Sequence, residues 1–150
     1  MSVCTLIVSD MPLSPVAPSR DYPLHINLDT GTLYDGGADD NFFLRPFPAA
    51  ADYTGKSGVC LDWHYTEGRA KRIIDYVRTA LEHGSTVELW HLWLEDYWEF
   101  EERPYIRKRT IPITELTPAL IRELDEAAIW NKPDPMYPQR PSFYCLAVTR

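Results

Sequence analysis

The stretch from residue 87 to residue 100 constrains the fold of this 150-residue chain more than any other segment. It reads V-E-L-W-H-L-W-L-E-D-Y-W-E-F and contains three of the five tryptophans. Residues 87–94 are apolar on both alternating faces, which is typical of a strand that is covered on both sides. We therefore expect this segment to form a central strand that leaves the core near residue 95.

Length and composition predict one globular domain spanning residues 1–150. A chain of this size can bury roughly two thirds of the surface that its unfolded form exposes. The hydrophobic fraction of 45% and the charged fraction of 25% are those of ordinary globular proteins. The formal net charge of −7 disfavours nucleic-acid binding, because phosphate neutralisation by Lys and Arg supplies most of that affinity. It favours a basic protein partner.

The sequence predicts a cytoplasmic protein. No apolar run approaches the length of a membrane span, so no membrane segment is expected. The N-terminus lacks the basic region and the long apolar run of a signal peptide. Cys4, Cys60 and Cys145 are odd in number and far apart, unlike the dense even set of a secreted disulfide framework. We expect the three thiols to be reduced.

Residues 67–83 carry the clearest helical pattern of the chain. Thr66 is the expected N-cap, and Gly84 occupies the place of a helix-terminating C′ glycine. One apolar stripe at helical spacing is formed by Ala70, Ile73, Ile74, Val77, Ala80 and Leu81. With strands at 59–65 and 86–94 on either side, the helix predicts a right-handed crossover between parallel strands.

The remaining segments predict a strand-rich chain with a second, shorter helix. Thr117 as N-cap and Pro118 at the first helical position begin a helix over about 118–127. Further strands are expected at residues 3–8, 24–28, 32–34, 105–113 and 143–148. The proline-rich stretches 11–23 and 131–141 are expected to be loops. The fold class is therefore α+β, with a mixed, mostly antiparallel sheet and two helices.

The strand that begins at residue 87 is expected to run through Phe100 and turn back into 105–113 as a long hairpin. The charges favour this pairing, because five carboxylates between residues 95 and 102 would face four basic residues. Those basic residues are Arg103, Arg107, Lys108 and Arg109. Each cross-strand ion pair contributes only a few tenths of a kcal/mol, so the pairing would set register more than stability.

An acidic aromatic surface is the first candidate site. Trp98 lies among carboxylates, and aromatic side chains anchor interfaces as readily as they fill cores. The expected partner-binding residues are Glu95, Asp96, Trp98, Glu99, Glu101 and Glu102, with Asp39 and Asp40 extending the surface. Such a surface would grip a basic protein. Core packing is the competing interpretation for Trp90 and Trp93.

A second interpretation is a small hydrolase or a metal-dependent enzyme. Cys60, Asp62 and His64 repeat every two residues and would share one face of a strand. With His91 from another strand they could hold zinc or form a Cys–His nucleophile pair. The paired spacing of most metal sites, such as C-x-x-C, is absent here, so the sequence predicts no metal, no cofactor and no catalytic residue. A third interpretation is an adaptor or homodimer that associates through the tryptophan-rich strand.

The order V-E-L-W-H-L-W-L, an acidic hairpin and then I-R-K-R-T-I-P-I-T-E-L-T-P-A-L-I-R-E-L resembles small bacterial immunity proteins of polymorphic and contact-dependent toxin systems. The resemblance covers roughly residues 86–129 and carries over no functional residue. It implies a compact, acidic, cytoplasmic protein that binds and neutralises a cognate toxin. An acidic inhibitor of a basic toxin gains electrostatic steering and is then held by desolvated aromatic anchors.

Overall fold

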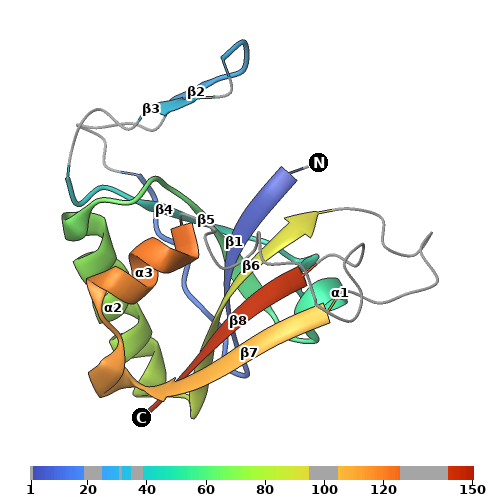
Figure 1. Cartoon of the computed structure of the whole chain (residues 1–150), viewed down its shortest axis with the longest axis vertical. Helices are drawn as coiled ribbons and strands as arrows, with labels where there is room; N and C mark the ends of the chain where they lie inside the picture. Colours follow the sequence, from blue (N-terminus) through green and yellow to red (C-terminus); the bar gives the residue numbers. More distant parts are fainter. Residues whose placement is uncertain (1, 19–24, 31, 35–38, 95–104, 126–141) are drawn as a thin grey trace.

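A computed structural model describes residues 2–18, 25–30, 32–34, 39–94, 105–125 and 142–150 (Figure 1). Its main element is a six-stranded sheet in the order β4-β5-β1-β6-β8-β7. These strands are β1 (Ser2–Ser9), β4 (Phe43–Pro46), β5 (Gly58–Asp62), β6 (Thr86–Leu94), β7 (Tyr105–Pro112) and β8 (Ser142–Thr149). All neighbouring strands run antiparallel except β7 and β8, which run parallel. The predicted α+β class with a mixed, mostly antiparallel sheet is confirmed.

Helices cover the two faces of the sheet unequally. The longer helices α2 (Glu67–Leu81) and α3 (Pro118–Asp125) pack on one face, and the short helix α1 (Ala50–Thr54) packs on the other (Figure 1). Both predicted helices are present, whereas α1 and the edge strand β4 were not predicted. A 3-10 turn, Ile113–Glu115, connects β7 to α3.

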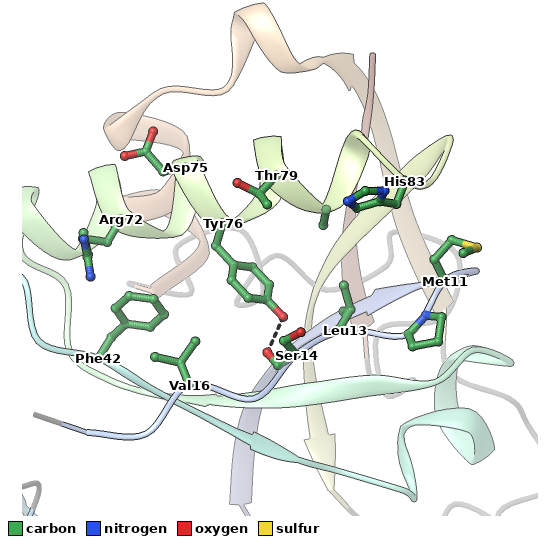
Figure 2. A pocket seen from close by; sticks show the side chains of 12 residues that line it. Met11, Leu13, Ser14, Val16, Phe42, Arg72, Asp75, Tyr76, Thr79 and His83 are labelled. Atoms are coloured by element: carbon green, nitrogen blue, oxygen red, sulfur yellow. Dashed lines mark hydrogen bonds between the residues drawn. The ribbon is translucent and has the colours of Figure 1, made fainter.

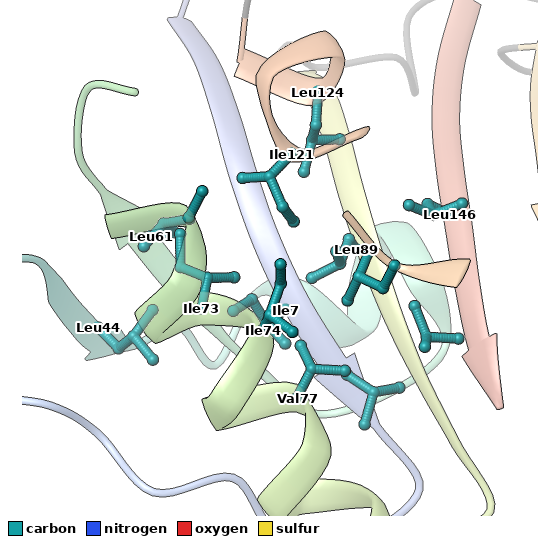
Figure 3. Packing of buried hydrophobic residues seen from close by; sticks show 14 of the residues in the cluster. Ile7, Leu44, Leu61, Ile73, Ile74, Val77, Leu89, Ile121, Leu124 and Leu146 are labelled. Carbon is teal, nitrogen blue, oxygen red and sulfur yellow. The ribbon is translucent and has the colours of Figure 1, made fainter. Parts of the chain in front are cut away.

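The larger hydrophobic core lies between the sheet and helices α2 and α3 (Figure 3). The apolar stripe predicted for α2 points into this core, with Ile73 and Val77 almost completely buried. The strands contribute Ile7, Leu44, Leu61, Leu89 and Leu146, and α3 contributes Ile121 and Leu124. Burying side chains of this size is the main favourable term in holding the helices on the sheet.

The opposite face of the sheet carries a smaller core, made of Cys4, Leu6, Val8, Ala50, Cys60, Trp90, Leu92, Phe143 and Cys145. We call this side of the sheet the thiol face, because all three cysteines lie on it. Strand β6 supplies Val87 and Leu89 to the helix-covered face and Trp90 and Leu92 to the thiol face. The prediction that residues 87–94 form a strand is confirmed, and the strand is buried on both faces over residues 87–92.

Both ends of α2 are capped, but only the first as predicted. The Thr66 hydroxyl accepts a hydrogen bond from the backbone N–H of Arg69 at 3.1 Å, which confirms it as the N-cap. The helix ends at Leu81, and Gly84 does not have the left-handed φ of a C′ glycine. Arg150 caps this end instead, since its guanidinium donates to the carbonyls of Leu81 and Glu82 at 2.7 Å each.

The predicted crossover is partly wrong. Strand β5 ends at Asp62 rather than at residue 65, and it runs parallel to β6 as expected. The two strands do not pair, however, because β1 lies between them and is antiparallel to both. A strand–helix–strand order favours two parallel strands, here β5 and β6. It does not show whether a strand from elsewhere in the chain, here β1, lies between them.

The predicted long hairpin is also wrong, because β8 lies between β6 and β7. Its residues Phe143–Val148 are buried throughout, which suits an interior strand. Strand β7 carries the exposed segment I-R-K-R and suits a sheet edge, where charges discourage further pairing. The carboxylates predicted to face β7, from Glu95 to Glu102, lie outside the described residues, as does Arg103. Lys108 pairs instead with Glu88 on β6.

The shorter elements follow the predicted order. Strands β2 (His25–Asn27) and β3 (Thr32–Tyr34), expected at residues 24–28 and 32–34, pair antiparallel as a separate two-stranded sheet. Helix α3 begins after Thr117, whose hydroxyl accepts from the N–H of Leu120 at 3.4 Å. Residues 126 and 127 of the predicted helix and the predicted loop 131–141 lie outside the described residues. None of the described helices is long and apolar enough to cross a membrane.

Candidate functional site

Six of the eight residues predicted to bind a partner lie outside the described residues. These are Glu95, Asp96, Trp98, Glu99, Glu101 and Glu102. The points where the described chain borders this segment are fixed, because Leu94 ends the central strand β6 and Tyr105 begins β7. Leu94 pairs with Ser2, and Tyr105 pairs with Ser142. Both border points therefore lie at the same end of the six-stranded sheet.

Asp39 and Asp40 are both exposed and precede β4. The first residue of β4, Phe43, pairs with Asp62 at the end of β5. This is the end of the sheet at which β6 also finishes, because β5 and β6 run in the same direction on either side of β1. The start of β4, which the two aspartates precede, and Leu94, the last described residue before the acidic segment, thus lie at one end of the sheet.

Asp39 also has a structural role at the start of α2. Its backbone carbonyl accepts a hydrogen bond from the Thr66 hydroxyl, and its carboxylate lies against Gly68 in the first helical turn. Negative charge at a helix N-terminus is favourable because unpaired N–H groups and the helix dipole point toward it. A partner that contacts Asp39 would therefore contact a residue held by the scaffold.

The four residues of the enzyme hypothesis are not brought together. Cys60 and Asp62 lie on the thiol face, whereas His91 pairs with Thr5 and faces the helices. His64 lies beyond the end of β5, and its side chain is exposed. Among the described residues, no three His, Cys, Asp or Glu side chains gather closely enough to hold a metal ion.

His91 is almost completely buried, with an exposed fraction of 3%. Burial lowers the pKa of its imidazole to about 4, because the surroundings disfavour the charged form. The ring is therefore neutral at physiological pH. Its position on the helix-covered face makes it part of the core of the molecule rather than of the thiol face.

The structure does bring Cys60 beside a residue that the sequence had not linked to it. The Sγ atoms of Cys4 and Cys60 lie 3.1 Å apart, and either sulfur can be the hydrogen-bond donor. Cys60 is opposite Leu6 in the register, so Cys4, two residues away, is on the same face and diagonal to it. Both thiols are buried and reduced.

Arg45 completes this cluster from strand β4, where it is opposite Cys60. Its Nη2 donates to the Cys60 Sγ at 3.6 Å, and its Nε donates to the Asp62 carboxylate at 2.7 Å. The guanidinium is about half exposed, while the sulfur beneath it is buried. We call Cys4, Cys60, Arg45 and Asp62 the dithiol cluster.

The pKa values of the two thiols in the dithiol cluster are shifted in opposite directions. A hydrogen bond from Cys4 and the nearby Arg45 charge lower the pKa of Cys60 and outweigh the effects of burial and of Asp62. The same hydrogen bond, together with burial, raises the pKa of Cys4. Cys60 is therefore the sulfur that ionises first, and Cys4 is the donor that stabilises the thiolate.

Cys145 provides a contrast on the same face. It is completely buried between Trp90 on β6 and Lys108 on β7 in the register. Burial raises the pKa of its thiol to about 12. A thiol with such a pKa is a small hydrophobic core side chain rather than a nucleophile.

A buried ion network lies near Cys145. The Glu88 carboxylate is 3% exposed and accepts hydrogen bonds from Lys56, Lys108 and the indole Nε1 of Trp90, at 2.9–3.0 Å. Burial raises the pKa of Glu88, but these three donors outweigh it and leave the pKa below its ordinary value. The network joins the segment after α1 to strands β6 and β7.

A cleft of about 430 Å³ lies between α2 and residues 11–16 (Figure 2). Tyr76 reaches across it and donates a hydrogen bond to the carbonyl of Ser14 at 2.7 Å. Burial raises the pKa of this phenol to about 12. The side chains that line the cleft are mostly apolar, and none of the predicted site residues is among them.

Comparisons of the chain with protein-family models, with curated proteins and with solved structures returned no match.

Sequence reasoning missed Cys4 and Arg45. Cys4 lies 56 residues before Cys60, and Arg45 lies on a strand that was not predicted. The alternation in β5 correctly places Cys60 and Asp62 on one face, but the neighbours on that face depend on strand order and register. Knowing that β1 pairs with β5, and in which register, would have revealed the cluster. The local sequence of either strand does not specify this pairing.

Proposed function

We propose that the chain is a non-catalytic binding protein that captures a basic protein partner through residues 95–102, with Asp39 and Asp40 extending the contact. The class of partner that we favour is a cognate toxin, which the chain neutralises as an immunity protein. The proposal rests on one observation, the concentration of negative charge in a single short segment.

Residues 95–102 contain five of the 22 acidic residues of the chain and no basic residue. The other 142 residues contain 17 acidic and 15 basic residues, so they carry only −2 of the net charge of −7. Several carboxylates of the described scaffold are also paired internally, as in Arg45–Asp62, Lys71–Glu67, Arg78–Asp75 and Glu88 with its two lysines. The charge excess thus belongs to the segment rather than to the whole surface.

The way the segment is attached supports a binding role. Its border residues Leu94 and Tyr105 belong to strands of one sheet, where Leu94 pairs with Ser2 of β1 and Tyr105 pairs with Ser142 of β8. A charged segment bordered by rigid strands loses less conformational freedom on binding than a free tail. Complementary charge accelerates encounter, and an aromatic such as Trp98 can then supply desolvated contact area.

The homodimer hypothesis receives no support from strand β6. Residues 87–91 of β6 pair on both sides, with β1 and with β8, and Trp90 is buried on the thiol face, where its indole donates to Glu88. Adding a strand from a second copy needs an open edge, which these residues do not offer. The binding hypothesis is therefore the one that we test.

The test is affinity capture from the source organism with three baits, followed by quantitative mass spectrometry. The baits are the wild type, the double variant Glu99→Lys/Glu101→Lys, and the control variant Glu82→Lys/Glu115→Lys, whose exposed sites lie elsewhere. Both variants change the net charge equally. We expect one basic protein to be recovered by the wild type and the control, and to be lost or strongly reduced with the Glu99/Glu101 variant.

The recovered protein is then expressed in a host cell with and without this chain. We expect growth arrest when it is expressed alone and rescue by the wild type, with weak rescue by the Glu99/Glu101 variant. Equal capture by both variants would show that the acidic segment is not the contact surface. Normal growth with the partner alone would remove the toxin class and leave only a binding role.

A further inference from the structure

The dithiol cluster does not belong to the proposed binding surface, and its geometry needs its own explanation. Two thiols on neighbouring strands lie in contact, and one of them is also hydrogen-bonded to a guanidinium. Lone buried cysteines usually behave as small hydrophobic residues, as Cys145 does here. A thiol paired with a second thiol and a cation is the arrangement that activates sulfur for oxidation.

We propose that Cys4 and Cys60 form a redox-active dithiol, in which a hydroperoxide oxidises Cys60 and Cys4 then closes a disulfide between strands β1 and β5. The oxidant is hydrogen peroxide or a small organic hydroperoxide. This proposal is independent of the proposed binding function. It concerns a covalent change within the scaffold, and none of the residues of the dithiol cluster belongs to the proposed contact surface.

The first step uses Cys60 as the nucleophile. Its thiol loses a proton, and the thiolate attacks one oxygen of the hydroperoxide. The S–O bond forms while the O–O bond breaks, so sulfur is oxidised and the peroxide is reduced. The departing oxygen takes up a proton and leaves as water or an alcohol. The product is a sulfenic acid on Cys60, held beside the Cys4 thiol.

The second step uses Cys4 as the resolving thiol. Its sulfur attacks the sulfenic sulfur of Cys60, the S–S bond forms and the S–O bond breaks. The Cys4 proton leaves with the hydroxyl group as water. The whole reaction converts two thiols and one hydroperoxide into one disulfide, one water and one further water or alcohol. The sulfur atoms start 3.1 Å apart and must approach by about 1 Å to reach disulfide bonding distance.

The contacts of the two sulfurs indicate that Cys60 is the nucleophile and Cys4 the resolving thiol. Arg45 donates a hydrogen bond to the Cys60 sulfur, and Cys4 lies against the same sulfur, so that its S–H can donate once Cys60 has lost its proton. Both contacts stabilise a thiolate on Cys60, in agreement with the lowered pKa of that thiol. Arg45 and Asp62 are partly exposed and border the buried sulfurs. A small peroxide needs less opening of this border than a bulky thiol reagent does.

The experiment treats the purified full chain with hydrogen peroxide, blocks remaining thiols under denaturing conditions, and maps every cysteine by peptide mass spectrometry. Cys145 is the internal control, because it shares the face and the burial but lacks a neighbouring thiol. We expect a peptide pair linked through Cys4 and Cys60 that dithiothreitol separates, with Cys145 still blocked as a free thiol. Equal oxidation of Cys145, or no linked pair at excess peroxide, would overturn the proposal.

Three variants test the assigned roles. Cys4→Ser should leave a sulfenic acid on Cys60 that dimedone traps, and Cys60→Ser should leave Cys4 unoxidised. Arg45→Gln should slow disulfide formation about tenfold, because removing a neighbouring cation raises a thiol pKa by roughly one unit or more. Arg45→Lys should restore part of the rate, and Arg72→Gln, an exposed change on α2, should not alter it.

Each contrary result has a definite meaning. Dimedone labelling of Cys4 in the Cys60→Ser variant would reverse the two roles and contradict the proposal as stated. An unchanged rate in Arg45→Gln would remove the guanidinium from the mechanism. The retained fold of each variant is checked by circular dichroism, and the Arg45→Lys variant keeps the test decisive when the Gln variant is poorly folded.

Discussion

Trp90 and His91 are neighbours in the sequence, but their environments differ completely. Trp90 lies on the thiol face, where its indole reaches Glu88, and His91 lies on the helix-covered face. Alternation along a strand explains this separation. It also explains why His91 and Cys60 cannot form one site, since the sheet itself stands between them. At the scale of single residues, the face of the strand decides the chemistry.

The buried His91 predicts acid sensitivity. Its pKa is about 4 in the folded chain and near 6.5 when unfolded, so the unfolded state binds the extra proton. Stability is therefore full above about pH 6.5 and falls as the pH drops toward 4, by up to about 3 kcal/mol. Urea unfolding of His91→Gln should show a flatter pH dependence between these values than the wild type. His64→Gln, at an exposed site, should keep the wild-type dependence, and identical slopes in all three would contradict this assignment.

Glu88 predicts a second loss at lower pH. Its folded pKa is below its ordinary value, so its contribution is present above that ordinary value and disappears as the pH falls through the folded pKa. At pH 7, Glu88→Ala should cost about 2–3 kcal/mol, because Trp90 loses its buried acceptor. Glu88→Gln should cost about half of this, since the amide oxygen still accepts from the indole.

The control for Glu88 is Glu67→Gln, which removes one partner of an exposed ion pair with Lys71 and should leave stability nearly unchanged, because solvent screens that pair. The difference between the wild type and Glu88→Gln should close as the pH falls through the folded pKa of Glu88, which lies below its ordinary value. A difference that persists in acid would mean that packing, rather than charge, gives Glu88 its importance.

At the scale of elements, helix α2 was predicted from local signals and is found nearly where they indicated. A capping hydroxyl and an apolar stripe act within a few residues of one another, so the sequence contains them completely. The end of the helix was less accurate. Arg150 caps the last turn from the far end of the chain, and a distant side chain leaves no local signal.

Removing the N-cap should destabilise the fold by a predictable amount. Thr66→Ala removes the acceptor for the Arg69 N–H and the donor to the Asp39 carbonyl, and should cost about 1 kcal/mol. Thr79→Ala is the matched control, because Thr79 is exposed near the end of the same helix and alanine favours helices. Urea unfolding measures both. An equal effect of the two changes would show that Thr66 acts through helix propensity alone.

At the scale of the whole molecule, the charge distribution divides the chain into a nearly balanced scaffold and one acidic segment. Long-range steering depends on this distribution and is screened by salt over a Debye length of about 8 Å at physiological ionic strength. The proposed class of partner is therefore argued from where the charge lies, and in this proposal the scaffold fixes the two border strands.

The corresponding prediction concerns association kinetics with the captured partner. The association rate of the wild type should fall steeply as salt rises, whereas Glu99→Lys/Glu101→Lys should associate more slowly and with a flatter salt dependence. Surface plasmon resonance at several salt concentrations measures this, with Glu82→Lys/Glu115→Lys as the charge-matched control. Parallel salt dependences for the two variants would mean that net charge, and not the segment, steers the encounter.

The sequence alone determined the α+β class, both longer helices, the double-sided burial of residues 87–92 and the location of the acidic excess. Each of these depends on neighbours along the chain, because helical and strand periodicity and local charge are properties of contiguous residues. Only the tertiary structure decided that β8 separates β6 from β7, that β1 separates β5 from β6, and that His91 and Cys60 face opposite ways. It also brought Cys4 and Arg45 to Cys60. Strand order and register are set by the burial of whole faces, so no single segment encodes them.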